Sequence, residues 1–165
     1  MVVVADTSPF IGLVKIGYVE VLPRLYRCVT IPPEVAAELA SPKRTPEVQA
    51  FIASSPAWLC VRSPVTMETI TGIDPGECAA ISLARELRAD LLLIDENAGR
   101  NAAMARHIQT VRTAAILLDA ANVGVLSDLK SAFDKLKATN FRVPVKVLDE
   151  LLKRHHQFRA RHAGT

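Results

Sequence analysis

The stretch Val2-Val3-Val4-Ala5-Asp6-Thr7-Ser8-Pro9 decides the fold, because in it a short apolar segment passes directly into a helix start. Consecutive apolar residues, most of them β-branched, are typical of a strand that is buried on both faces. Ser8 followed by Pro9 matches a helix N-cap and a proline at the first helical position. Asp6 stands between these two elements. An apolar strand, an acid and a helix in this order predict one unit of a parallel α/β sheet.

The same alternation continues along the chain. Further short apolar segments are separated by helical patterns, which predicts a parallel sheet covered by helices on both faces. The strand candidates are Val2–Ala5, Cys28–Ile31, Leu59–Val61, Leu91–Ile94 and, more weakly, Thr110–Val111.

Helix boundaries are marked by capping residues and prolines. Asp74-Pro75 opens the helix with the clearest apolar pattern. Ser127 is expected to cap a helix that ends near Asn140, which suits a left-handed C-cap. The segment from Ser41 to Ser55 contains several Pro, Ser and charged residues and is expected to be a mobile excursion. Further helices are expected to begin at Pro32-Pro33, Thr45-Pro46, Asn97 (ending near His107) and Pro144.

The length and composition fit one domain. Half of the 165 residues are apolar, enough for a sizeable core. We place the domain at residues 1–152 and treat residues 153–165 as a basic helix end or tail. No segment is long and apolar enough to span a bilayer, and the N-terminus does not resemble a signal peptide. We therefore predict a cytoplasmic protein.

Cysteines and charge exclude some classes of site and leave others open. Cys28, Cys60 and Cys78 lack a CxxC spacing, which predicts reduced, buried thiols and not a disulfide or a zinc site. The net charge of +3 permits contact with nucleic acid without indicating it. The basic residues after residue 152 fit either RNA binding or a solvated helix end, and their short run with the single aromatic Phe158 favours the helix end.

Acidic residues directly follow two of the strand candidates. Asp6 comes after the first, and Asp95-Glu96 come after the fourth. Ligands of parallel α/β sheets bind outside the carboxyl ends of the strands. Each acid could instead cap the next helix, although Ser8 and Asn97 are available for that purpose. We favour a site role for Asp6 and Asp95, whereas Glu96 fits both interpretations.

Two further acids have a plainer local explanation. Asp74-x-x-Glu77 matches a capping box, in which the Glu side chain bonds back to the backbone of the cap. Glu38 lies on a helix next to Leu39, and its spacing fits a solvated helix face. From spacing alone neither Glu77 nor Glu38 would be assigned to a site.

Acids from distant positions, without a His or Cys ligand pattern, fit Mg²⁺ or Mn²⁺ better than zinc. Such ions can activate a water molecule and stabilise charge on a phosphodiester. The sequence shows no Gly-rich phosphate loop and no Ser/His/Asp set. The residues therefore favour a hard-cation site at the carboxyl end of the sheet.

Four segments, in order, resemble the PIN-domain proteins, in particular the uncharacterised PIN-like subfamily near the VapC-type toxins of bacteria and archaea. The resemblance covers residue 2 to about residue 152. Its segments are Val3 to Pro9, Ile31 to Leu39, Gly76 to Ile81, and Leu92 to Glu96 with Gly99-Arg100.

This resemblance implies a three-layer α/β/α sandwich with a central parallel sheet of about five strands. It also implies a Mg²⁺- or Mn²⁺-dependent ribonuclease, the toxin of a toxin–antitoxin pair, with RNA as substrate, a small antitoxin protein as partner, and a homodimeric state. The implied catalytic and metal-binding acids are Asp6, Glu38, Glu77 and Asp95, with Glu96 as a further metal ligand. The implied neighbours of substrate and metal are Ser8, Asn97, Arg100 and Thr113.

The chain departs from the family pattern at two places. Related sequences often carry two Asp where this chain has Asp95-Glu96, and Asn97 could supply a neutral oxygen instead. After the fifth strand the subfamily tends to have Gly-Thr-x-Gly, whereas this chain has Arg112-Thr113-Ala114-Ala115 and keeps only the Thr. Arg100 is retained, either to meet a phosphate or as an exposed helix residue.

Two other functions compete with the ribonuclease. The first is a PIN fold that binds RNA or a protein without cutting. The second is a phosphatase-like enzyme with Asp6 as nucleophile, which is disfavoured because Ser8 stands where a second Asp is expected. The apolar residues between Ser8 and Leu25 fit either a dimer face or ordinary core packing; they include Leu13, Val14, Ile16, Val19 and Leu22.

Overall fold

The computed structural model describes residues 1–162, and in this range the chain forms a five-stranded sheet in the order β3-β2-β1-β4-β5. All neighbouring strands are parallel. Each strand agrees with its predicted position to within one residue. The strands are β1 Val3–Ala5, β2 Val29–Ile31, β3 Leu59–Val61, β4 Leu91–Leu93 and β5 Thr110–Val111.

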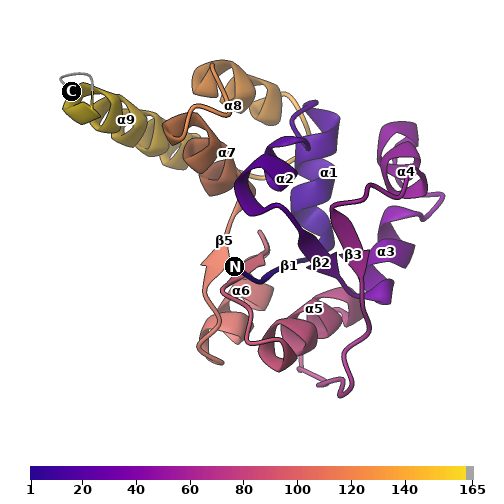
Figure 1. Cartoon of the computed structure of the whole chain (residues 1–165). Coiled ribbons are helices and arrows are strands. Elements are labelled where there is room, and N and C mark those ends of the chain that lie inside the picture. The colour runs from indigo at the N-terminus through magenta and orange to yellow at the C-terminus, as the bar shows by residue number, and fades with distance from the viewer. Residues whose placement is uncertain (163–165) are drawn as a thin grey trace.

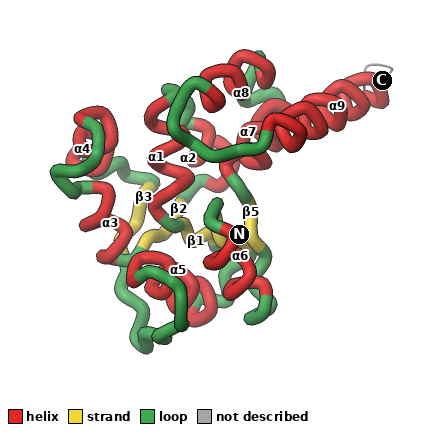
Figure 2. Tube along the Cα trace, turned by 180° about the vertical axis from the view of Figure 1, so that it is seen from behind, coloured by secondary structure: helices red, strands yellow, loops and turns green. Residues whose placement is uncertain are grey.

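Helices cover both faces of the sheet, so the predicted three-layer sandwich is confirmed. Figure 1 shows α5 and α6 on one side of the sheet and α1, α2 and α7 on the other. The helices α3 and α4 stand beside the edge strand β3 (Figures 1 and 2). The helices are α1 Thr7–Lys15, α2 Val21–Tyr26, α3 Pro33–Leu39, α4 Pro46–Ala53, α5 Pro75–Glu86, α6 Asn97–Met104, α7 Thr113–Asn122, α8 Leu129–Lys137 and α9 Val145–His162.

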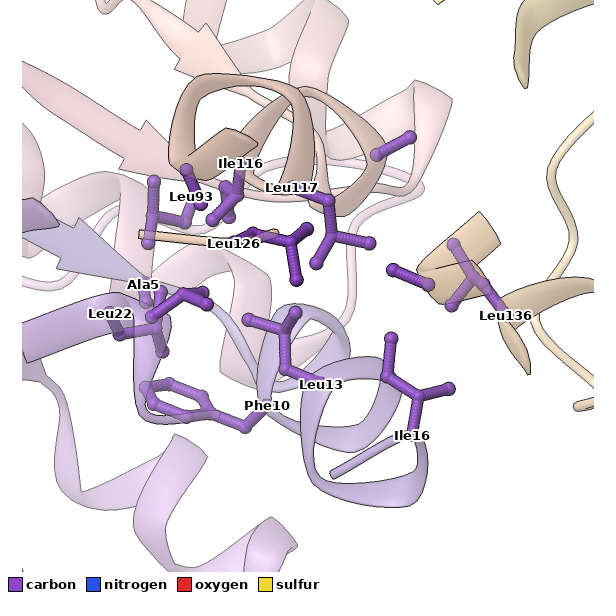
Figure 3. Packing of buried hydrophobic residues seen from close by; sticks show 14 of the residues in the cluster. Ala5, Phe10, Leu13, Ile16, Leu22, Leu93, Ile116, Leu117, Leu126 and Leu136 are labelled. Carbon is purple, nitrogen blue, oxygen red and sulfur yellow. The ribbon is translucent and has the colours of Figure 1, made fainter. Parts of the chain in front are cut away.

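The alternation of side chains along β1 explains why the strand is apolar throughout. Val3 and Ala5 join the larger core under α1, α2 and α7, whereas Val4 joins a smaller core under α5 and α6. In Figure 3, Phe10 and Leu13 of α1 approach residues of α7 and the sheet. The apolar residues of α1 and α2 are thus used inside the protein, which favours core packing for the segment in which a dimer face had been considered.

Several predicted helix boundaries are wrong. Asp6, and not Ser8, is the N-cap of α1, so Pro9 stands at the third helical position instead of the first. Proline is tolerated there because backbone N–H groups in the first turn have no helical partner. Asp128, and not Ser127, caps α8 by accepting a hydrogen bond from the Ser131 N–H at 2.8 Å. The helix expected to reach His107 ends at Met104, and α7 was not predicted.

The segment between Ser41 and Ser55, expected as a mobile excursion, is largely the packed helix α4. Val48 is fully buried, and the Phe51 ring stacks on Phe10 with centroids 5.7 Å apart. The turn before α4 is fixed by a 2.7 Å hydrogen bond that the Gln49 side chain donates to the carbonyl of Arg44. The helix start predicted at Thr45-Pro46 is confirmed. The polar composition wrongly indicated a mobile segment because only one face of α4 needs to be apolar.

The last helix, α9, runs without a break through residue 152, where the predicted domain ends. Its C-terminal half projects away from the rest of the protein (Figures 1 and 2). His155 bonds to Asn122 of α7, with 2.8 Å between Nδ1 and Oδ1. Residues 163–165 of the predicted tail lie outside the described range. No helix within residues 1–162 combines the length and the apolar character that a membrane crossing requires.

The cysteines differ from the prediction of buried thiols. Cys78 is buried in α5, but Cys28 and Cys60 are exposed, and all three are free. Cys60 lies on the edge strand β3, so that its side chain escapes the cover that central strands receive.

Candidate active site

Asp6 and Asp95 follow the neighbouring strands β1 and β4 at their carboxyl ends. The chain fills the sheet in one direction from β1 to β3 and then crosses to β4 on the other side of β1. The Asp6 N–H donates to the carbonyl of Leu93 at 2.9 Å, which keeps the two strand ends together. This reversal of strand order is where open α/β sheets bind their ligands. The predicted placement of both acids is therefore confirmed.

Five carboxylates line a pocket of about 440 Å³ at this edge, which we call the acidic pocket. It joins the end of β1 to α3, to the start of α5 and to the start of α6. Three of the four predicted catalytic acids are among its lining, and Asp74 was not predicted. The carboxylates are those of Asp6, Glu38, Asp74, Glu77 and Glu96.

Asp6 is almost fully buried in this pocket, with 5% of its surface exposed. Burial raises the pKa of Asp6 to about 6, and the nearby carboxylates of Asp74 and Glu38 add to the rise. The backbone N–H groups of Thr7 and Ser8 oppose it. Although Asp6 is the N-cap of α1, its side chain makes no capping hydrogen bond within the described chain. Among the side chains of the described residues, only Ser8 Oγ donates a hydrogen bond to this carboxylate, so it can still receive a ligand.

Glu77 does not behave as a capping-box residue. Asp74 accepts a 2.9 Å hydrogen bond from the Glu77 N–H, which is one half of the box. Glu77 Oε1, however, is buried and has no hydrogen-bond partner among residues 1–162. Burial raises the pKa of Glu77 to about 7, with further increases from Asp74, Asp6 and Glu96. The local explanation for Glu77 is thus incomplete, and its side chain is held in the pocket at an energetic cost.

Glu38 is fixed by two neighbours from other elements. Thr7 Oγ1 donates to Glu38 Oε2 at 2.9 Å, and the Arg44 guanidinium forms an ion pair with Oε1. Arg44 Nε also donates to the backbone carbonyl of Glu38 at 3.3 Å. A Cβ on Gly76 would stand 3.0 Å from Glu38 Oε2 and 3.3 Å from Asp74 Oδ1. The absent side chain of Gly76 therefore lets α3 and α5 bring these two acids together.

Asp95 lies in a neighbouring pocket of about 780 Å³, which we call the arginine pocket. Both of its carboxylate oxygens accept hydrogen bonds from Thr113, at 2.9 Å from the backbone N–H and 2.7 Å from Oγ1. Burial raises the pKa of Asp95, and the hydrogen bonds from Thr113 oppose the rise. The charged lining residues of the arginine pocket are Arg44, Arg112, Arg142, Asp95 and Glu96.

Ser8 connects the two pockets and lines both. Its Oγ donates to Asp6 Oδ2 and accepts from the Asp95 N–H, each at 3.3 Å. Glu96 and Arg44 also line both pockets. The acids after β1 and β4 are thus linked through one hydroxyl group.

The remaining predicted neighbours are divided between the pockets and the interior. Asn97 lines the arginine pocket and accepts a hydrogen bond from Arg112 through Oδ1. Thr113 is fully buried and donates two hydrogen bonds to Asp95. Arg100 is half-buried, is absent from the lining of both described pockets, and has a pKa lowered by burial and by Arg112.

The chemistry of the acidic pocket fits a divalent cation, although its acids are not gathered at ligand distances. Among residues 1–162, no three His, Cys, Asp or Glu side chains form a ready metal-binding group. The donors are all hard oxygen atoms, as Mg²⁺ and Mn²⁺ prefer. The Glu77 oxygen that lacks a hydrogen-bond partner within residues 1–162, together with the raised pKa values of Asp6 and Glu77, indicates negative charge that a cation would stabilise.

Sequence reasoning missed three residues of this region. Asp74 was predicted only as a helix cap, yet it caps α5 and lines the acidic pocket. Arg44 was placed in a mobile segment, and Arg112 was noted only as a departure from a glycine pattern. The repeated acids of Asp74-x-x-Glu77 could have indicated the first, whereas nothing local marks the two arginines.

The chain is an α/β domain whose parallel sheet carries acids at the point where the strand order reverses, beside an arginine-lined pocket. The chain belongs to the PIN-domain family, whose model, described as PIN domain, matches residues 2–157. Members of this family are generally nucleases and typically use divalent metals. The resemblance inferred from the sequence is therefore confirmed.

One solved structure supports the fold independently. It is a PilT N-terminus domain protein from the hyperthermophilic archaeon Sulfolobus solfataricus P2, 19% identical to this chain, with a TM-score of 0.56. The match covers 72% of this chain and 92% of that chain. At this identity the likeness concerns the fold alone. No curated protein matches the sequence significantly.

Proposed function

We propose that this protein is a metal-dependent ribonuclease that hydrolyses phosphodiester bonds with Mg²⁺ or Mn²⁺. One observation carries the proposal: the buried oxygen of Glu77, which has no hydrogen-bond partner in the described part of the chain, shares a pocket with Asp6, and both carboxyl groups have raised pKa values. Selection for stability alone would not favour two carboxyl groups that are buried close to one another, because each raises the cost of charging the other. A cation that binds there removes the conflict.

Asp6, Glu38 and Glu77 would hold the metal, with Asp74 and Glu96 at the edge of the same pocket. When bound, the ion would activate a water molecule and offset charge on the phosphate under attack. Asp95 would take part from the neighbouring pocket, where Thr113 fixes its orientation. Ser8 would hold the relative positions of Asp6 and Asp95.

The arginine pocket would receive the RNA backbone next to the metal. Arg44, Arg112 and Arg142 line it, and arginine binds phosphate through two parallel N–H groups. Phe141 of the same lining offers an aromatic surface for a base. Because Ser8, Arg44 and Glu96 line both pockets, a phosphate bound in the arginine pocket would lie beside the acids.

The finer biological role is a further proposal, which is motivated by the family resemblance. We propose that the protein is the toxin of a toxin–antitoxin pair and that a small protein antitoxin covers the pockets. A short reading frame beside the gene is expected to encode it, and co-expression should give a complex without RNA cleavage. We also keep the homodimer as a proposal, to be tested by light scattering of the purified chain.

A second candidate is a module that binds RNA or protein without cutting. Arg44 already pairs with Glu38, and both oxygens of Asp95 are satisfied by Thr113, so these two acids have partners without a metal. Such a module would retain RNA affinity but would show no metal-dependent cleavage.

The deciding experiment measures cleavage of a single-stranded RNA by the wild type with Mn²⁺ and with EDTA. Asp6→Asn should reduce the metal-dependent rate by on the order of 100-fold or more. Asp149→Asn is the matched control, because Asp149 is exposed on α9 and outside both pockets. Cleavage that survives Asp6→Asn would refute the proposed site, and intact RNA with every variant would favour the binding module.

A further inference from the structure

Two exposed cysteines meet at the edge of the sheet, away from the acids. The sulfur atoms of Cys28 and Cys60 are 3.2 Å apart, although the residues are 32 positions apart in the chain. Both side chains are exposed, whereas the third thiol, Cys78, is buried in α5. This contact joins the residue before β2 to the middle of β3.

The strand register explains why the two sulfur atoms meet. Thr30 of β2 is the partner of Cys60 in the parallel ladder, so their side chains leave the sheet on the same face. Cys28 precedes Thr30 by two residues and points to this face as well, because side chains alternate along a strand. The Cys28–Cys60 contact is therefore a diagonal pair between two neighbouring parallel segments, with both side chains on the same face of the sheet.

We propose that Cys28 and Cys60 form a reversible redox-modification site, which closes to an intramolecular disulfide by exchange with a low-molecular-weight disulfide such as oxidised glutathione. The short distance between the sulfur atoms, the shared face and the access to solvent favour this exchange. Burial and the neighbouring Cys60 thiol raise the pKa of the Cys28 thiol, so we expect the exchange to be faster at mildly alkaline pH. The inference does not depend on the proposed ribonuclease activity.

The exchange takes place in two balanced steps. One cysteine thiolate attacks glutathione disulfide, forms a mixed disulfide and releases one glutathione thiolate. The other cysteine thiolate attacks the protein sulfur of that mixed disulfide and releases the second glutathione. The protein loses two hydrogen atoms, that is two protons and two electrons, and one glutathione disulfide becomes two glutathione thiols. An excess of reduced glutathione reverses both steps.

The disulfide would enclose the segment that carries α3 and α4. This loop contains Glu38 of the acidic pocket and Arg44, its ion-pair partner. A covalent link between the start of β2 and the edge strand β3 restricts the unfolded chain more than the folded one. We expect the oxidised protein to melt several degrees higher than the reduced protein, by roughly 4 °C or more.

The test incubates the full chain with oxidised glutathione, blocks free thiols with iodoacetamide and measures intact and peptide masses. With the iodoacetamide step carried out in denaturant, which exposes the buried Cys78, we expect wild type to lose two hydrogen atoms, to carry a peptide linked through Cys28 and Cys60, and to keep Cys78 as its remaining alkylated thiol. Cys28→Ser and Cys60→Ser should each end with a stable glutathione adduct on the remaining partner. Cys78→Ala is the control and should form the linked peptide as wild type does.

Three results would overturn the proposal. In the first, the wild-type protein ends with separate glutathione adducts on Cys28 and Cys60. In the second, its disulfides join two protein molecules in preference to two cysteines of one molecule. In the third, Cys28 and Cys60 do not react with oxidised glutathione. The mass measurement on wild type does not depend on the serine variants, so the proposal can still be tested if a variant folds poorly. Oxidised wild type that melts at or below the temperature of the reduced form would contradict the predicted constraint.

Discussion

A Cβ atom on Gly99 would stand 2.8 Å from Oε1 of Glu77, so the absence of a side chain at Gly99 makes room for the buried carboxylate. The same Cβ would come within 2.6 Å of Ile94 Cδ1. Gly99 lies in the first turn of α6 and Glu77 in the first turn of α5. The position of a site acid is thus set by the close approach of two helix starts.

We expect Gly99→Ala to destabilise the protein even though alanine is the better helix former. The gain in helix propensity is about 1 kcal/mol, whereas overpacking of a close contact costs about 1–3 kcal/mol. The net loss should be up to about 2 kcal/mol in urea unfolding at pH 7. Asn101→Ala is the control, because residue 101 is exposed on the same helix. A Gly99→Ala variant more stable than wild type would show that Glu77 moves freely.

The metal-free protein should lose stability as the pH rises from about 4 to about 7. The folded protein keeps protons on Asp6 to about pH 6 and on Glu77 to about pH 7, whereas the unfolded chain loses them near the ordinary carboxyl values of 3.8 and 4.5. Because the folded state binds more protons in this range, stability is highest below it and falls through it. Urea unfolding in EDTA at pH 4.5, 6 and 8 measures the decline.

Glu77→Gln should remove much of this pH dependence. The uncharged amide avoids the burial of a carboxylate. The free energy of unfolding of the variant, relative to that of wild type, should therefore rise by on the order of 2–3 kcal/mol from pH 5 to pH 8. Glu150→Gln, an exposed acid on α9, is the matched control and should show no such gain. If the difference in free energy of unfolding between wild type and Glu77→Gln were the same at pH 5 and at pH 8, the pKa of Glu77 would not be raised.

Thr113→Val should weaken the fold and free Asp95. Valine has the shape of threonine but cannot donate the 2.7 Å hydrogen bond to Asp95 Oδ2. A hydrogen bond to a charged group contributes about 1.5–3 kcal/mol, so a loss of this size is expected in urea unfolding at pH 8. Thr69→Val, at an exposed loop position, serves as the control. No change in stability would mean that the backbone N–H of Thr113 is sufficient to hold Asp95.

Binding of Mn²⁺ should release protons near pH 6.5. Asp6 and Glu77 together hold about one proton at this pH, which a bound cation would displace. Calorimetric titrations in buffers of different ionisation heat should show about one proton released at pH 6.5 and almost none at pH 8.5. Asp6→Asn should lower both the affinity and the release. Binding without proton release at pH 6.5 would place the metal away from these two acids.

Local patterns predicted the strands and two of the acids because their causes lie within a few residues. Val3 to Ala5 are buried on both faces, and this burial requires an apolar residue at each position. Asp6 and Asp95 follow adjacent strands, and the ends of parallel strands meet at one edge. The errors at Ser8 and Ser127 arose because several first-turn residues can take the cap position, and only the path of the backbone selects one.

The sequence by itself determined the α/β class, the five strands and the placement of Asp6 and Asp95, since each depends on short-range periodicity and burial. Tertiary structure alone decided that Glu38, Asp74 and Glu77 join Asp6 in one pocket. Contacts such as that of Thr7 with Glu38, 31 positions apart, depend on how α1, α3 and α5 pack. Spacing within one turn cannot distinguish a capping Glu from a ligand, because the packing of distant helices determines which groups are desolvated together.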